Sequence, residues 1–216
     1  MSQLHREVAS IEDQVEEMAN LAKGMLEGGV QSLIDLDREA AEVVLGQGEA
    51  LAQLDEDIEA HILRTFALQE PVAGDLRRIG TALKLITYIN RIGRYGRDVA
   101  KVTTEWPEGA DHVARMVNLP TMGEKVARMV DIAILAFRDG TDPDTTTLMQ
   151  LEDDVDAMRY SIWREALTYM AQDPHTIERC AHYMMVGRYL ERCGDNVVKM
   201  AEKLHWSATG KRILLK

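Results

Sequence analysis

The stretch YLERCGDN at residues 189–196 decides the fold, because an eroded copy of it, YINRIGRY, occupies residues 88–95. Similarity of this kind within one chain indicates a duplicated structural unit. The two copies differ in charge, since the later one has Glu191 and Asp195 where the earlier one has Asn90 and Arg94. We therefore expect two units of one fold whose chemistry is no longer the same.

The composition around these copies favours helices. Apolar residues make up 46% of the 216 residues and aromatic residues only 5%, and the commonest residues are strong helix formers. The five prolines fall between segments with helical periodicity, where they separate helices. The sequence thus predicts helices over residues 3–35, 37–68, 71–102, 121–138, 142–172 and 174–206. We expect Asp37 to cap the second helix and Pro71 to lie in the first turn of the third. In the first segment, residues with helical spacing form an apolar stripe: Val8, Ile11, Val15, Met18, Ala19, Ala22 and Met25.

These six long helices predict an all-α fold made of two tandem three-helix bundles. Short turns within each triplet favour antiparallel neighbours, and 216 residues are enough to bury a core. The expected division is a first repeat at residues 1–105, a linker at 106–120, a second repeat at 121–208 and a tail at 209–216.

Net charge and cysteine usage limit the possible partners and the cellular compartment. The net charge of −11 argues against nucleic acid as a partner. Cys180 and Cys193 fall in one predicted helix, roughly 20 Å apart and too distant for a disulfide. The N-terminal residues are polar, unlike a signal peptide, and no apolar run reaches the length of a membrane span. We expect a reduced, cytoplasmic protein that meets a membrane only through partners.

Two pairs of carboxylates could bind a metal ion. Glu152 and Asp156 are four residues apart on the fifth predicted helix, and Glu191 and Asp195 are four apart on the sixth. Residues at this spacing share a helix face, and consecutive antiparallel helices could bring the pairs together. A hard cation would compensate four converging carboxylates. The alternative is a solvated acidic face. Glu191 and Asp195 follow Leu190 and Gly194 at the edge of the core face, so we expect them in a surface groove and not in a buried site.

The first repeat retains only half of this pattern. Asp55 and Glu59 match the fifth-helix pair, but Asn90 and Arg94 replace the sixth-helix pair. An arginine can neutralise two carboxylates without a metal ion. We therefore expect a salt bridge from Arg94, or a weaker metal site, in this repeat. The third predicted helix also has a cluster of arginines, which could bind phosphate or an acidic partner; the alternative is a solvated helix face with internal salt bridges. They are Arg77, Arg78, Arg91, Arg94 and Arg97.

Taken together, these motifs resemble those of the PhoU family of phosphate-uptake regulators. The stretch ALQEPVAGDLRR at residues 67–78 is similar to one signature of that family, and LERCGD at residues 190–195 is similar to another. The resemblance covers about residues 4–206. Where the family usually has histidine after the aspartate, this sequence has Asn196 and Tyr95.

The resemblance implies a function as well as a fold. It implies a cytoplasmic, commonly dimeric protein that restrains phosphate uptake and the phosphate-starvation response. Its implied partners are the ATPase subunit of the phosphate ABC transporter and a sensor histidine kinase. The implied cofactor is a metal ion, often iron, with Mg, Mn, Zn and Ca as alternatives. Carried over residue by residue, one metal cluster is expected at Glu152, Asp156, Glu191 and Asp195.

Three hypotheses follow from the sequence. The first is a regulator, and not an enzyme, that binds proteins and metal as a homodimer. The second is a metal-dependent enzyme built on a carboxylate bundle, although no residue stands out as a positioned acid or base. The third is a helical scaffold, a paralogue with other partners.

Overall fold

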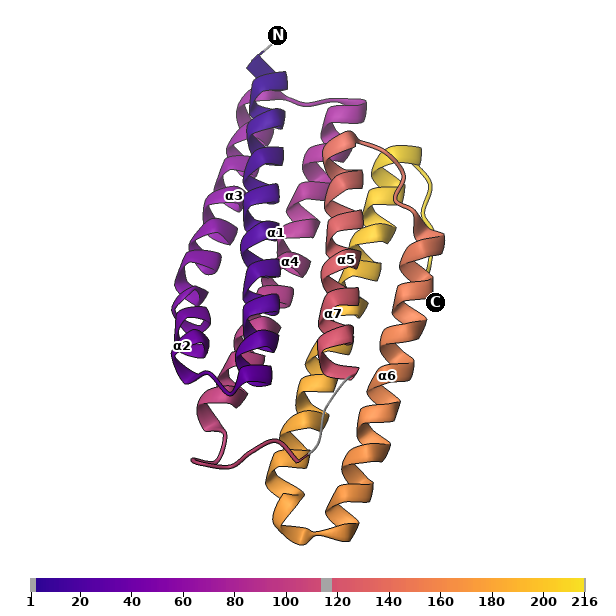
Figure 1. Cartoon of the computed structure of the whole chain (residues 1–216). Coiled ribbons are helices and arrows are strands. Elements are labelled where there is room, and N and C mark those ends of the chain that lie inside the picture. The colour runs from indigo at the N-terminus through magenta and orange to yellow at the C-terminus, as the bar shows by residue number, and fades with distance from the viewer. Residues whose placement is uncertain (1–2, 114–117, 216) are drawn as a thin grey trace.

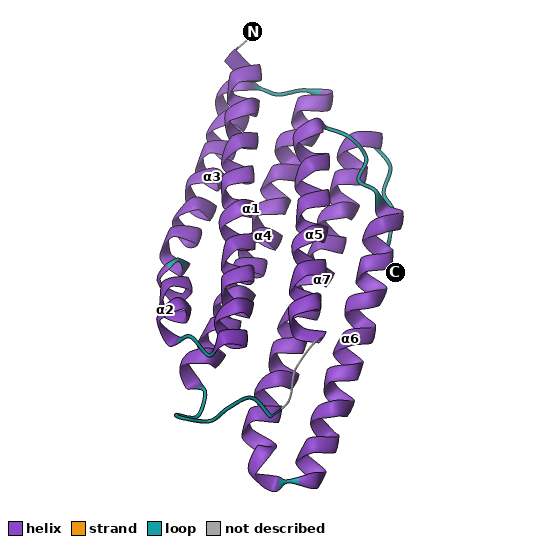
Figure 2. Ribbon diagram, viewed as in Figure 1, coloured by secondary structure: helices purple, strands orange, loops and turns teal. Residues whose placement is uncertain are grey.

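The computed structural model describes residues 3–113 and 118–215. Within these ranges the protein consists of helices and connecting loops, without a strand (Figure 2). The helices lie side by side along one direction (Figure 1). The predicted all-α class is therefore confirmed.

The first repeat contains α1 (Gln3–Asp35), α2 (Arg38–Gly46), α3 (Gly48–Gln69) and α4 (Ala73–Glu105). The second predicted helix is broken in two at Gln47, because Gly46 and Gly48 flank that residue and glycine is a poor helix former. Asp37 caps α2 as expected, since its side chain accepts a hydrogen bond from the Ala40 amide. Pro71 lies outside α4, which corrects the expectation for it. Glu70 is left-handed and Val72 extended, so the chain reverses through residues 70–72 before α4 begins.

The second repeat contains α5 (Asn118–Asp139), α6 (Thr145–Gln172), the short 3₁₀ helix η1 (Pro174–Thr176) and α7 (Ile177–Thr209). α5 begins within the predicted linker, with Pro120 in its first turn, where a missing amide hydrogen costs little. α6 begins after Asp144, whose side chain accepts a hydrogen bond from the Thr147 amide. α7 extends beyond the predicted end until Gly210 adopts a left-handed conformation, with a φ of 73°.

The two repeats share one hydrophobic core. α1 and α4 of the first repeat pack against α5 and α7 of the second, whereas α2 and α3 flank one side of this group and α6 the other (Figure 1). Buried side chains of both repeats form a single cluster, and all seven residues of the predicted apolar stripe on α1 belong to it. The domain boundaries at residues 105, 120 and 208 stay a prediction.

The described part of the linker is anchored to both repeats. Trp106 is buried and packs against the rings of His112, His182 and Tyr183. The Tyr183 hydroxyl is 2.7 Å from Nδ1 of His112 and accepts a hydrogen bond from the Val113 amide. Residues 114–117 of the predicted linker and residue 216 of the predicted tail lie outside the described residues.

Two further expectations concern cysteines and membrane spans. Cys180 and Cys193 are free and buried, which agrees with the predicted absence of a bond between them. Among the described residues, no helix combines the length and apolarity that crossing a bilayer requires.

Candidate functional site

The predicted metal-binding side chains of the second repeat lie where α6 packs against α7. Glu152 reaches across from α6 to the backbone of α7 at Gly194. A Cβ atom built on Gly194 would stand 2.5 Å from Oε2 of Glu152, so the missing side chain makes room for the carboxylate. Oε2 is buried and has no hydrogen-bond partner among the residues that the structure describes.

Burial makes the carboxyl group of Glu152 a weaker acid than usual. Removal from water raises the pKa of its carboxyl group to about 8, and the charges of Asp195, Asp156 and Glu191 act in the same direction. These carboxylates are therefore close enough to repel one another, as the sequence spacing indicated.

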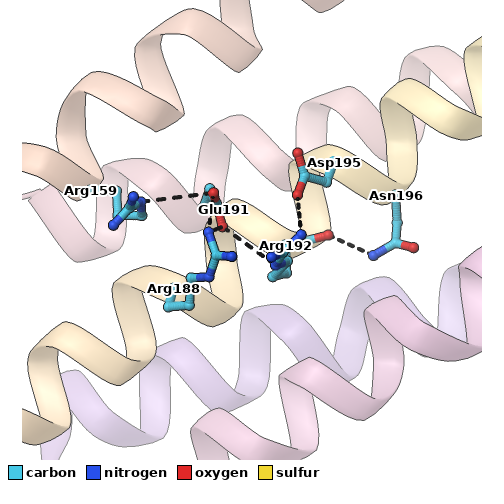
Figure 3. Close-up of polar contacts among 6 residues, drawn as sticks. All are labelled: Arg159, Arg188, Glu191, Arg192, Asp195 and Asn196. Carbon is cyan, nitrogen blue, oxygen red and sulfur yellow. Dashed lines mark hydrogen bonds and ion pairs between the residues drawn. The ribbon is translucent and has the colours of Figure 1, made fainter.

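Glu191 is paired with arginines. Arg188, one turn earlier on α7, donates to both carboxylate oxygens of Glu191, at 2.6 Å for Oε2. Arg159 of α6 is 3.8 Å from Oε1 and Arg192 is 3.9 Å from Oε2 (Figure 3). Glu191 is only 8% exposed, so the expected position in a surface groove is wrong for this residue. Glu191 lies on the face of α7 that packs against α6. Burial raises the pKa of Glu191, and the positive charge of Arg188 opposes that rise.

The other two carboxylates are less buried. Asp195 accepts a hydrogen bond of 3.0 Å from Arg192 (Figure 3). Asp156 is exposed. Across residues 3–113 and 118–215, no three His, Cys, Asp or Glu side chains are placed to hold a metal ion. In this arrangement arginines already neutralise Glu191 and Asp195, and metal binding at the four carboxylates stays a prediction.

In the first repeat, the partner of the Asp55 carboxylate is Asn90 and not Arg94, from which we expected a salt bridge. Asn90 donates a hydrogen bond of 3.0 Å to Asp55, whose pKa is raised by burial. Glu59 is exposed. Arg94 forms no ion pair with Asp55, Glu59 or any other residue in the described part of the chain, so the predicted salt bridge is wrong. One helical turn separates Arg94 from Asn90. Both line a small pocket beside α3, and Arg94 also lines a second, larger space that Asn90 does not reach.

That space is a pocket of about 700 Å³ between α4, α6, α7 and the tail. Arg91, Arg94 and Tyr95 line it from α4, and Glu152 and Asp195 line it from α6 and α7. The sequence reasoning missed this pocket. It also missed Arg159 and Arg188 as partners of Glu191, although the i, i+3 spacing of Arg188 and Glu191 was a readable signal.

Comparison with known proteins relates this duplicated helical architecture to a family. The PhoU domain matches residues 15–103 and again residues 119–204. The chain belongs to the PhoU family. Both repeats of the family are therefore present, and each includes one copy of the motif that reads YLERCGDN in the second.

Individual relatives agree with this assignment. The chain is 39% identical over 157 residues to a phosphate-specific transport system accessory protein PhoU homologue of Deinococcus radiodurans, covering 72% of each chain. It is 28% identical to the protein of the same description from Clostridium acetobutylicum, covering 91% of this chain and 90% of that one.

Solved structures show the same fold. The PhoU crystal structure from Pseudomonas aeruginosa has a TM-score of 0.88 and 27% identity, covering 97% of this chain and all of that one. The phosphate transport system regulatory protein PhoU from Streptococcus pneumoniae has a TM-score of 0.87 at 22% identity, with 99% of this chain covered, and supports the fold alone.

Proposed function

We propose that this PhoU protein is a regulatory accessory protein of phosphate uptake that acts by contacting other proteins and catalyses no reaction. It restrains the phosphate ABC transporter through the ATPase subunit and the starvation response through a sensor histidine kinase. It does so in the cytoplasm as a homodimer. The observation that carries the proposal is the match of both repeats to PhoU, because the relatives found are named as accessory proteins of phosphate-specific transport.

Restraint follows from selective binding. A protein that binds one conformation of a transporter ATPase better than another shifts the population toward the bound conformation. If that conformation is a low-uptake state, docking of the helical bundle reduces phosphate import without any chemical step.

The test is co-purification from cells of the same organism. We expect the full-length chain to retain the ATPase subunit and the sensor kinase when phosphate is plentiful, and less of both under starvation. The ATPase subunit of an unrelated ABC transporter is the matched control. Absence of both partners under high phosphate would contradict the proposal.

Light scattering of the purified chain tests the dimer. The expected mass is twice 24.3 kDa.

Metal binding by Glu152, Asp156, Glu191 and Asp195 stays a prediction. A metal ion would have to displace Arg188 and Arg192 from their carboxylates, and the unpartnered Oε2 of Glu152 is the atom that favours its entry. Metal analysis of the purified chain compared with a Glu152→Gln, Asp156→Asn double variant tests it. Loss of bound metal in the double variant is the expected result. Glu124→Gln on the exposed face of α5 is the control, and equal metal content in all three proteins would refute metal binding here.

A further inference from the structure

The pocket between α4, α6 and α7 is built from the same positions of the two repeats. α4 and α7 pack against each other, and most of the residues with which they line the pocket stand in equivalent places of the two repeats. Three of the four pairs differ in chemistry, and the fourth is arginine in both repeats. The equivalent pairs are Arg91 and Arg192, Arg94 and Asp195, Tyr95 and Asn196, and Asp98 and Lys199.

Most charged groups on the α7 side of the pocket already have partners. Arg192 donates to Asp195 at 3.0 Å, and Lys199 donates to the buried Glu202 at 2.8 Å. On α4, Asp98 is 3.6 Å from Arg97. These pairs leave little net charge on the α7 side of the pocket and around Asp98.

Two arginines on α4 differ from these paired groups, because neither forms an ion pair with a residue that the structure describes. Arg94 has no hydrogen bond or ion pair with any residue that the structure describes, and Arg91 has only a contact with the Tyr88 ring, 6.0 Å from its centroid. They are three residues apart and therefore share a helix face. Two guanidinium groups on one face present forked donors that match the oxygens of a phosphate group.

Acidic side chains of α6 also line the pocket, namely Glu152, Asp153 and Asp156. Asp153 and Asp156 are exposed to solvent, so water and salt screen their repulsion of a bound anion, whereas Oε2 of Glu152 lies against Gly194 of α7. A ligand with hydroxyl or amino donors beside its phosphate could use them as acceptors. The volume of about 700 Å³ is also larger than a free phosphate needs and is in the range of pockets that bind small organic molecules.

We propose that this pocket binds a phosphate group, held by Arg91 and Arg94, from either inorganic phosphate or a small phosphate ester such as a nucleotide. The inference rests on the proposed function in one respect, because a regulator of phosphate uptake needs a ligand that reports phosphate status. It assigns to the first repeat the recognition of an anion, at the position where the second repeat has a carboxylate.

Calorimetric titration of the purified full-length chain, in a buffer containing a chelator, tests the proposal. The probes are inorganic phosphate, AMP and adenosine, the last of which lacks a phosphate group. We expect binding of at least one phosphate-bearing probe and none of adenosine. An Arg91→Ala, Arg94→Ala double variant should weaken that binding at least about tenfold, because two charge-assisted contacts are lost. Comparison of inorganic phosphate with AMP identifies the source of the phosphate group.

A matched double variant, Arg64→Ala with Arg128→Ala, controls for the loss of two positive charges. Both arginines are exposed on α3 and α5 and line none of the pockets described. This variant should bind as the wild type does, and circular dichroism checks that both variants are folded. No binding of phosphate or AMP by the wild type, or equal binding by the Arg91, Arg94 variant, would overturn the proposal.

Failure here is distinguishable from failure of the proposed function. The titration needs no transporter and the co-purification needs no small ligand. A chain that retains the ATPase subunit but binds no phosphate group would refute only the pocket ligand. A chain that binds phosphate through Arg91 and Arg94 but retains no partner would refute only the regulatory contacts.

Discussion

Glu152 is the residue with the largest conflict between burial and charge in the site. Its carboxylate lies over Gly194, where the absent side chain makes room for it, and one of its oxygens has no partner in the described part of the chain. Neighbouring carboxylates add repulsion. A neutral side chain of the same shape would remove that conflict without opening a cavity.

The stability of the protein should therefore depend on pH through Glu152. Its folded-state pKa of about 8 lies above the ordinary 4.5, so the folded protein holds this proton more tightly than the unfolded chain does. The resulting contribution to the free energy of unfolding is complete below about pH 4.5 and is lost as pH rises through about 8. Urea denaturation at pH 5 and pH 8 should show a smaller loss of stability in Glu152→Gln than in the wild type. Glu124→Gln should behave as the wild type; an identical pH dependence in all three would contradict the assignment.

Gly194→Ala should move the Glu152 carboxylate. The new methyl group would stand only 2.5 Å from Oε2, and a flexible side-chain end can turn away toward solvent more easily than a backbone can shift. Solvation would then return the pKa of Glu152 from about 8 toward 4.5. NMR titration of the carboxyl carbon measures this change. Gly24→Ala, where a Cβ meets nothing within 4 Å, should leave the titration unchanged.

At the scale of elements, glycines set how closely helices of the first repeat approach. A Cβ on Gly96 of α4 would stand 2.6 Å from the Leu26 amide nitrogen of α1, and a Cβ on Gly29 of α1 would clash with the Gly96 carbonyl oxygen. Backbone atoms cannot turn aside as a carboxylate can. The α1–α4 contact therefore requires glycine at both positions.

Gly96→Ala should accordingly destabilise the protein by about 1–3 kcal/mol or more, since overpacking forces the two helices apart. Gly24→Ala, in the exposed middle of α1, should instead stabilise it by about 0.5–1 kcal/mol through helix propensity. Equilibrium denaturation in urea measures both changes. A Gly96→Ala protein as stable as the wild type would show that the helices do not pack this closely.

At the scale of the whole molecule, the duplicated halves are one structural unit. α1 and α4 bury apolar side chains against α5 and α7, and the linker is held between the repeats by Trp106 and Tyr183. Separation of the repeats would expose this shared surface to water. The sequence duplication is thus not matched by two independent cores.

Thermal unfolding should therefore occur as one cooperative transition. Calorimetry should give equal calorimetric and van't Hoff enthalpies. Phosphate, if it binds as proposed between α4 and α7, should raise the midpoint of that same transition. Two resolved transitions would indicate that the repeats unfold separately.

By itself the sequence determined the helical class, the duplication and the family, because these depend on local periodicity and on motifs that are read along the chain. The stripe from Val8 to Met25 and the cap at Asp37 are local features of this kind. Tertiary structure alone decided the partners of the charged groups. Arg94 is one turn from Asn90, yet it faces the pocket and not Asp55, and Glu191 is paired with Arg159 from another helix. Such pairings depend on the rotation and approach of packed helices, which residue spacing within one helix does not specify.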